Sequence, residues 1–190
     1  MGTITSKLNK RVLLTGGSGF IASHILDALL EDGRFQVVVT ARSDEKGKKL
    51  VDSVKPHNIS YVVVEDIAKE DAFDQVFKSQ PPFRYVIHTA SPYHLDVQDP
   101  VKDFLAPAVN GTTGLLKSIK AHGPTVKRVV ITSSSAAILN PDKHEPVYNE
   151  NFWAPVTEED AIRDPAKNAY RASKVRVWPC CDAGPRADDA

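Results

Sequence analysis

Two residues near the end of the chain have side chains suited to proton transfer. Tyr170 and Lys174 lie four positions apart in the segment Tyr-Arg-Ala-Ser-Lys, so on a helix they would share one face. A lysine ammonium beside a phenol favours the phenolate. Such a tyrosine can give a proton to a carbonyl oxygen as a hydride arrives at carbon, or take one in reverse. Because a Tyr-x-x-x-Lys pair alone is usually an ordinary surface pair, the rest of the sequence must decide between the two interpretations.

A glycine-rich turn far upstream supports the chemical interpretation. The segment Arg11–Ala22 runs from an apolar strand through Thr-Gly-Gly-Ser-Gly into a helix-like stretch. Its glycines would provide a tight turn and a close approach to phosphate, and backbone N–H groups at the helix start could bind a pyrophosphate. The alternative is a plain strand–turn–helix connection. The residues expected to contact a cofactor here are Gly16, Gly19, Phe20 and Ile21.

The end of the next predicted strand indicates which cofactor would bind. An NAD site usually places a carboxylate there for the ribose 2′-hydroxyl, whereas this chain has Thr-Ala-Arg-Ser at residues 40–43. Arg42 could bind a 2′-phosphate through its fork of donors, and Lys46 could add a point charge. Asp44 and Glu45 lie beyond the strand end. NADPH is therefore the predicted cofactor, and an exposed basic loop is the alternative.

The ends of two further strands complete the predicted cofactor site. Asp66 could accept a hydrogen bond from an adenine amino group while Ile67 packs on the ring, although carboxylates at strand ends are common. His88 is expected to be a packed strand histidine rather than a base. Small side chains after it would leave room for a ribose and nicotinamide at the point where the strand order reverses. These residues are Thr89, Ala90 and Ser91.

Short β-branched runs alternate with amphipathic segments, which predicts βαβ units and an α/β fold with a doubly wound parallel sheet. Each run is nearly all apolar, as expected for strands covered on both faces. Right-handed crossovers give the strand order 3-2-1-4-5, and residues 140–164 are expected to form a long loop. The predicted strands are 11–15, 36–41, 60–65, 85–89 and 128–133. The predicted helices are 20–30, 46–54, 72–78, 101–121 and 165–177.

Composition limits the classes of function. The chain has 190 residues, 24 basic and 24 acidic, with 42% hydrophobic and 25% charged residues, so no nucleic-acid partner is indicated. The first ten residues are too polar for a signal peptide, and no apolar run reaches membrane-spanning length. The adjacent Cys180 and Cys181 define neither a disulfide framework nor a metal site. A cytoplasmic, enzyme-like domain without metal is the expectation, and composition does not decide the oligomeric state.

The segment after Lys174 loses helical periodicity. Pro179 and the pair Gly184-Pro185 would stop any helix. The sequence therefore predicts a nucleotide-binding domain over residues 8–177, an irregular and disordered tail over residues 178–190, and a sheet of five strands with no sixth strand to cover its edge.

In combination, these motifs resemble the extended short-chain dehydrogenase/reductase family. Within it, the chain resembles the dihydroflavonol-4-reductase-like branch, which includes fungal aldehyde and ketone reductases of the methylglyoxal type. The resemblance covers roughly residues 8–174. Its motifs are Thr-Gly-Gly-Ser-Gly-Phe-Ile-Ala from Thr15, Ala-Arg-Ser with Lys46, Val-Ile-His-Thr-Ala-Ser-Pro from Val86, Pro-Ala-Val-Asn-Gly-Thr from Pro107, Arg-Val-Val-Ile-Thr-Ser-Ser from Arg128 and Asn-Ala-Tyr-Arg-Ala-Ser-Lys from Asn168.

The resemblance implies site roles. Ser134 would be the catalytic serine, with Ser133 as the fallback, Tyr170 the acid/base and Lys174 its partner. Asn110 falls near a supporting asparagine of some relatives. Family members continue past the lysine-bearing helix into a C-terminal substrate lobe, and this chain departs from that pattern, which predicts a truncated member.

Three functions remain open from the sequence. The first is an NADPH-dependent reductase of a small aldehyde or ketone. The second is a truncated chain that binds NADP(H) without catalysis. The third is a nucleotide-sugar epimerase or dehydratase, or a 3β-hydroxysteroid dehydrogenase. Arg42 and the Thr-Ala-Ser-Pro strand end favour the reductase, because many epimerases keep an acidic residue after the second strand.

Overall fold

The computed structural model describes residues 10–54, 58–91 and 98–177, so the predicted tail lies outside the described residues. The chain divides into two compact units. The first comprises Met1–Ala90 and Gly114–Thr132, and the second comprises Ser91–Thr113 and Ser133–Ala190. Among the described residues, no helix is both long and apolar enough to cross a membrane.

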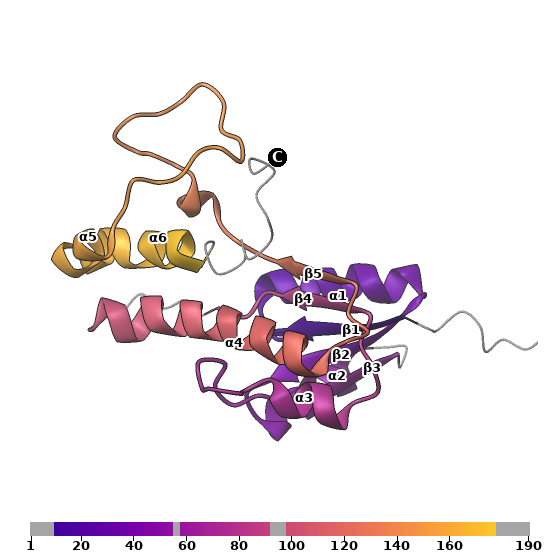
Figure 1. Ribbon diagram of the computed structural model, residues 1–190. Helices are drawn as coiled ribbons and strands as arrows, with labels where there is room; N and C mark the ends of the chain where they lie inside the picture. Colours follow the sequence, from indigo (N-terminus) through magenta and orange to yellow (C-terminus); the bar gives the residue numbers. More distant parts are fainter. Residues whose placement is uncertain (1–9, 55–57, 92–97, 178–190) are drawn as a thin grey trace, which may run out of the picture. The chain divides into compact units, whose positions relative to one another are not determined.

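The first unit is built on a five-stranded parallel sheet, as predicted (Figure 1). The strand order is β3-β2-β1-β4-β5, so β1 is central and the order reverses between β1 and β4. Parallel pairing places the carboxyl ends of all five strands at one edge of the sheet. The strands are β1 (Lys10–Thr15), β2 (Phe35–Ala41), β3 (Ile59–Val63), β4 (Tyr85–His88) and β5 (Arg128–Ile131).

Within the described residues, six α-helices lie between and after the strands, together with a π-helical turn and a 3₁₀ turn. The α-helices are α1 (Phe20–Asp32), α2 (Asp44–Ser53), α3 (Asp74–Ser79), α4 (Ala106–His122), α5 (Glu158–Arg163) and α6 (Pro165–Val177). The π-helical turn is η2 (Val101–Leu105) and the 3₁₀ turn is η3 (Ser135–Ala137).

The predicted single helix over residues 101–121 is wrong at its start. Its first turn is π-helical, with the N–H of Ala106 donating to the carbonyl of Val101. Pro107 explains the change, because it has no N–H to bond the carbonyl of Asp103 and its ring would clash with that carbonyl in an α-helix.

The predicted loop over residues 140–164 is also wrong at its end, because it contains α5. Thr157 caps this helix by accepting from the N–H of Asp160, and the Asp160 carboxylate accepts from the N–H of Thr157. This capping box supplies partners for N–H groups that a short helix otherwise leaves unpaired. Its pattern, Thr-Glu-Glu-Asp, is readable in the sequence. The same kind of signal was missed at α2, which begins at Asp44 because the Ser43 hydroxyl accepts from the N–H of Lys46.

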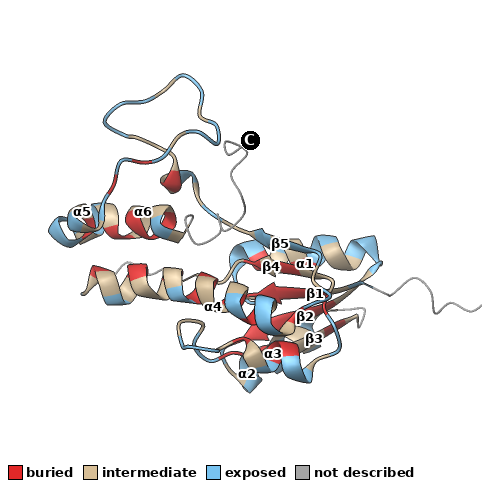
Figure 2. Cartoon of the chain, in the orientation of Figure 1, coloured by how far each residue is buried: buried red, intermediate tan, exposed pale blue. Residues whose placement is uncertain are grey.

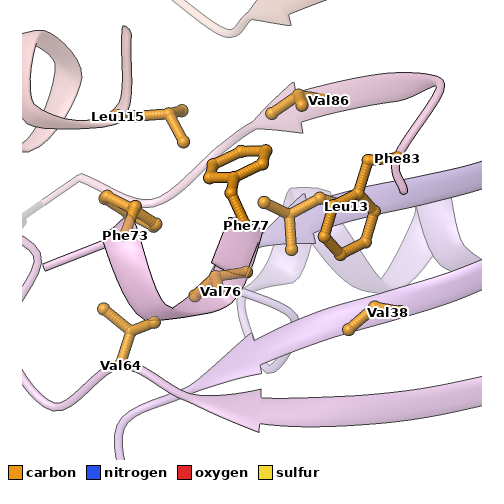
Figure 3. Packing of buried hydrophobic residues seen from close by; sticks show 9 residues of the cluster. All are labelled: Leu13, Val38, Val64, Phe73, Val76, Phe77, Phe83, Val86 and Leu115. Atoms are coloured by element: carbon orange, nitrogen blue, oxygen red, sulfur yellow. The ribbon is translucent and has the colours of Figure 1, made fainter. Parts of the chain in front are cut away.

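The residues of the central strands are mostly buried, as the colours of Figure 2 show. Leu13 and Val38 belong to a cluster with residues of α3 and α4 (Figure 3). Leu14 and Val37, their chain neighbours, belong to a second cluster with residues of α1. Neighbouring strand residues point to opposite faces, so a strand covered by helices on both sides must be apolar throughout.

The second unit has an apolar cluster of its own. Phe104 and Leu105 of η2 pack with small residues of α5 and α6 and with the segment before α5. The other buried members are Ala154, Val156, Ala161, Ala169 and Ala172. The alanines let α6 approach its neighbours closely, and this packing fixes the face of α6 that carries Tyr170, which lies at the edge of the cluster.

The start of α2 is held against β3 by one tyrosine. A Cβ added at Gly47 would lie 2.2 Å from Cδ2 of Tyr61, and the Tyr61 hydroxyl donates to Oδ1 of Asp44 at 2.7 Å. Position 47 must therefore be glycine, because the Tyr61 ring occupies the space that a Cβ would need. Because Ser43 caps the same helix, this contact also positions the residues at the end of β2.

We expect Gly47→Ala to lower the free energy of unfolding by about 1–3 kcal/mol, the usual cost of overpacking. Gly114→Ala is the matched control, because a Cβ at this helical glycine meets nothing within 4 Å. It should raise the free energy of unfolding by about 0.5–1 kcal/mol. Urea unfolding of both variants measures the difference, and equal midpoints would contradict the role given to Tyr61.

Candidate functional site

The glycines between β1 and α1 serve different purposes. Gly16 has φ of +72°, and a Cβ there would lie 3.1 Å from the Cα of Ala90. A Cβ at Gly17 would lie 2.6 Å from Cβ of Val39, a backbone-anchored atom that cannot move aside. Gly19 has φ of −80°, and its added Cβ would meet only the Gly16 carbonyl oxygen at 3.1 Å. The fold therefore requires glycine at positions 16 and 17 more strictly than at position 19.

The N-terminus of α1 has the features of an anion site. Gly19 is its N-cap, with no side-chain cap and no acidic residue in the first turn. Phe20 and Ile21 are 81% and 53% exposed, which is unusual for large apolar side chains beside a glycine turn. N–H groups in a first helical turn lack intrahelical partners and carry the positive end of the helix dipole. A pyrophosphate fits this end of α1, because an exposed glycine allows its close approach.

The basic residues predicted to select the cofactor lie at the end of β2. Arg42 and Lys46 are exposed, and no ion pair within the described ranges engages either side chain. The nearby carboxylate of Asp44 accepts from the Tyr61 hydroxyl, and this bond raises the pKa of Tyr61. Arg42 and Lys46 therefore remain available to a phosphate group.

Asp66 and Ile67 follow β3 and have partners within the protein. Asp66 Oδ1 accepts from the N–H of Ala68 at 2.9 Å, which closes a local turn. Ile67 is half-buried and packs against the first core cluster. The part they would play toward an adenine stays a prediction.

The hydroxyl of Thr15 joins the ends of β1 and β4. Its oxygen lies 3.1 Å from the N atoms of both Thr89 and Ala90, which donate to it, and 2.8 Å from Nδ1 of the buried His88. A hydroxyl has two acceptor positions and one hydrogen, so the Thr15 hydrogen is donated to His88. The ring hydrogen of His88 then sits on Nε2. This burial and bonding agree with a packed strand histidine, and Thr15 is a determinant of the site that the sequence interpretation missed.

In the second unit, α6 brings Tyr170 and Lys174 together on one face, as their spacing predicted. The Lys174 Nζ lies 5.2 Å from the centre of the Tyr170 ring, and the Tyr170 ring packs edge-on against Phe104. Lys174 is only 7% exposed, and its Nζ donates to Oγ of Ser91 at 2.6 Å. Burial lowers the pKa of Lys174 from its ordinary value of 10.5 to about 8.

Ser134 belongs to the same unit as Tyr170. It is the N-cap of η3, where its Oγ accepts from the N–H of Ala136 at 3.1 Å, and η3 packs against α6. Ser134 is half-buried, whereas Ser133 and Asn110 are exposed. The local geometry therefore favours Ser134 over Ser133 as the serine near α6, and assigns Asn110 no contact with it.

A hydrogen-bonded chain that the sequence did not reveal holds α6 in the second unit. Arg171 donates to Oδ1 of Asn168 and to the carbonyl of Leu139, both at 3.2 Å. The Asn168 amide donates to the carbonyl of Asp160 in α5. These bonds tie the segment after η3 and the helix α5 to the helix that carries Tyr170. A sequence shows these residue types but not their partners.

The predicted cofactor residues of the glycine turn and of the strand ends belong to the first unit, up to Ala90. Ser91, Ser134, Tyr170 and Lys174 belong to the second unit. Each unit thus carries one part of the predicted chemistry, a helix end suited to an anion in the first and a buried lysine beside a half-buried tyrosine in the second.

The sheet order and the glycine turn define a nucleotide-binding α/β fold, and family comparison gives a narrower class. A model of the NAD dependent epimerase/dehydratase family matches residues 12–184. The chain therefore belongs to this family, the extended short-chain dehydrogenase/reductases. The resemblance inferred from the motifs is confirmed.

Among curated relatives, the chain is similar to the ketoreductase azaE of Aspergillus niger, with 54% identity over 171 residues, 88% of this chain and 50% of the relative. The NADPH-dependent methylglyoxal reductase GRE2 of Saccharomyces cerevisiae is 44% identical over 169 residues, 86% of this chain and 49% of the relative. The chain thus spans about half the length of the curated relatives it matches.

Solved structures show the same similarity. Yeast methylglyoxal/isovaleraldehyde reductase Gre2 complexed with NADPH superposes with a TM-score of 0.83 at 42% identity, covering 90% of this chain and 51% of that one. UDP-glucose 4-epimerase from Bifidobacterium longum, in complex with NAD⁺ and UDP, gives a TM-score of 0.68 at 26% identity, covering 91% of this chain and 48% of that one. The reductase is thus the closer relative of the two by both measures.

The buried ammonium of Lys174 gives the folded chain a distinct pH dependence. The folded-state pKa of about 8 lies below the ordinary value of 10.5, so between these values the unfolded chain binds more protons. The Lys174 contribution to the free energy of unfolding must then rise with pH. Between about pH 8 and about pH 10, the free energy of unfolding should rise with pH more steeply for wild type than for Lys174→Met. We expect the two slopes to differ by up to about 1.4 kcal/mol per pH unit.

Urea titrations at several pH values measure this slope. Lys167→Met, which changes an exposed lysine of the same helix, is the matched control and should keep the wild-type slope. Identical slopes for wild type and Lys174→Met would mean that the ammonium is solvated in the folded protein.

Proposed function

We propose that the chain binds NADPH and reduces the carbonyl group of a small aldehyde or ketone to an alcohol. The observation that carries the proposal is the Lys174–Tyr170 pair on α6, with the lysine buried and its Nζ 5.2 Å from the ring centre. The names of the relatives agree with it, since azaE is called a ketoreductase and GRE2 an NADPH-dependent methylglyoxal reductase.

The first unit supplies residues that fit the cofactor. The exposed first turn of α1 would hold the pyrophosphate, and Arg42 with Lys46 would hold the 2′-phosphate. Thr89 and Ala90 would lie near the nicotinamide ribose, because ligands of this fold bind where the strand order reverses. Bound NADPH supplies the hydride to the carbonyl carbon.

The second unit supplies the proton. The Tyr170 hydroxyl gives its proton to the carbonyl oxygen, and the Lys174 ammonium stabilises the phenolate that remains. The Ser134 hydroxyl donates to the same oxygen and so favours the charge that develops on it. The reaction adds a hydride to carbon and a proton to oxygen, which gives the alcohol.

One observation favours a second candidate, NADPH binding without turnover. The chain spans about half the length of the reductases that it matches, and the activity of those proteins belongs to their full length. The epimerase alternative has less support, with 26% identity to the epimerase against 42% to the yeast reductase. A cytoplasmic location stays a prediction.

Binding of NADPH is expected to raise the midpoint of thermal unfolding more than NADH does. A ligand at about a hundred times its Kd stabilises the folded state by about 2.7 kcal/mol. Arg42→Ala should weaken NADPH binding about tenfold or more, since it removes charged hydrogen bonds, and should leave NADH binding unchanged.

Arg34→Ala is the matched control, because Arg34 is exposed, precedes the opposite end of β2 and pairs with Asp32. Equal effects of the two variants on NADPH binding would exclude a 2′-phosphate site at Arg42. No response of wild type to either nucleotide would exclude the cofactor itself.

Tyr170→Phe separates catalysis from binding. We expect it to keep NADPH binding and to lower the rate of carbonyl reduction by about a hundredfold or more, the usual contribution of a general acid. The assay follows NADPH oxidation with a panel of small aldehydes and ketones. Tyr148→Phe is the control, because the bonds of the Tyr148 hydroxyl within the described residues are to backbone groups of its own loop.

If wild type oxidises NADPH in the presence of a carbonyl and Tyr170→Phe does so at the same rate, the role proposed for Tyr170 is contradicted. A wild-type chain that binds NADPH and reduces no carbonyl would support the second candidate.

A further inference from the structure

Within the described residues, the ammonium of Lys174 has one hydrogen-bond acceptor, a hydroxyl. Lys174 is 7% exposed, and Oγ of Ser91, at 2.6 Å, is the only hydrogen-bond acceptor that the described residues give its Nζ. The other interaction of the ammonium is with the face of the Tyr170 ring, 5.2 Å away. Both partners belong to the second unit.

The carboxylates of the elements packed against α6 bind elsewhere. These elements are η2, η3 and α5, and η3 has no titratable side chain. In η2, the Asp103 carboxylate accepts from backbone N–H groups that precede the turn, and Lys102 pairs with Asp99. In α5, the Asp160 carboxylate closes the capping box and Glu158 pairs with Arg176. The remaining carboxylate of α5, Glu159, is exposed. Desolvation is accordingly the only cause that lowers the pKa of Lys174.

We propose that Ser91 is a positioning residue whose hydroxyl holds the amino group of Lys174 against the ring of Tyr170. Without this oxygen, the buried ammonium would lose the partner that offsets its desolvation. It would then deprotonate more readily, and the neutral amine would no longer present a positive charge to Tyr170. The consequence for Tyr170 rests on the proposed function, whereas the bond between Ser91 and Lys174 does not.

The hydroxyl can serve both protonation states of the lysine. It accepts from the ammonium, and it can donate its own hydrogen to the neutral amine. The pair can therefore stay together while Lys174 titrates, which an ionised carboxylate in place of Ser91 would not allow, because it has no hydrogen to donate. The site thus needs at position 91 a neutral group that can both accept and donate a hydrogen bond, and the Ser91 hydroxyl is such a group.

The direct test is the titration of Lys174 without cofactor or substrate. Protein labelled with lysine carrying ¹³C at Cε gives one NMR signal per lysine, and the Lys174 signal is the one absent from Lys174→Met. We expect the titration midpoint to fall by about one pH unit in Ser91→Ala, because the charged form loses its acceptor. Ser91→Thr, which keeps the hydroxyl, should retain the wild-type midpoint.

Ser173→Ala is the matched control, because this buried serine adjoins Lys174 but donates to the carbonyl of Tyr170. The titration midpoint of Lys174 in this variant should equal that in wild type. A comparison of Ser91→Val with Ser91→Thr repeats this test of the hydroxyl, because valine and threonine have the same side-chain shape. A midpoint that does not fall when the hydroxyl is removed, or one that falls as far in Ser173→Ala, overturns the proposal.

Unfolding of the variants is also decisive. If Ser91→Ala and Ser91→Val fail to fold, adding Lys174→Met should restore folding, since the unpaired ammonium would be gone. Absence of that rescue overturns the proposal. A midpoint that falls as expected in a chain that reduces no carbonyl leaves Ser91 assigned and rejects only the proposed reductase.

Discussion

The first unit depends on the hydroxyl of Thr15, which uses all of its hydrogen-bonding capacity. It donates to His88 and accepts from the amides of Thr89 and Ala90, and the Thr89 hydroxyl donates in turn to the Thr15 carbonyl. Thr15 is fully buried, where each unmade bond would cost about 1–3 kcal/mol. The network therefore fixes the end of β1 to the segment after β4. The glycine turn starts at the next residue, so this side chain helps to set the position of the turn relative to that segment.

The glycine turn satisfies two different constraints at once. Gly16 and Gly17 are required because other parts of the protein occupy the space a side chain would need, namely Ala90 and Val39. Gly19 is under little such constraint, since its backbone is extended and its surroundings are nearly open. A residue that folding does not require to be glycine, at an uncapped helix end beside exposed Phe20, is better explained by the approach of an outside group. This distinction comes from distances, and the pattern of glycines in the sequence could not supply it.

The sequence predicted the sheet well because its signal is physical and local. Both faces of the central strands β1 and β2 are covered, so these strands read as apolar runs, and the right-handed crossover rule then fixes the order. The errors lie where a local rule was outweighed or overlooked. Pro107 turned the start of a predicted helix into a π-helical turn, and the capping box at Thr157 began a helix inside a predicted loop.

Spacing also placed Tyr170 and Lys174 on one face correctly. What spacing could not give was the partner of each group, such as Tyr61 for Gly47 or Leu139 for Arg171, because those partners are distant in sequence.

The burial of Lys174 is the feature that favours the proposed chemical role of this residue over a purely structural one in the second unit. A lysine kept for stability would be expected to reach solvent or a carboxylate, because burying an unpaired ammonium is costly. Here the ammonium is enclosed, has a hydroxyl in place of a counter-ion and faces an aromatic ring. A carboxylate at the position of Ser91 would stabilise the ammonium more strongly, but it would also offset the positive charge that Tyr170 experiences. A neutral acceptor leaves that charge available to a phenolate, and it keeps the pKa of Lys174 near 8, where the amine and the ammonium differ little in free energy at physiological pH. Burial of Lys174 costs stability, and it leaves beside the Tyr170 ring a cation that no carboxylate in the described part of the unit neutralises.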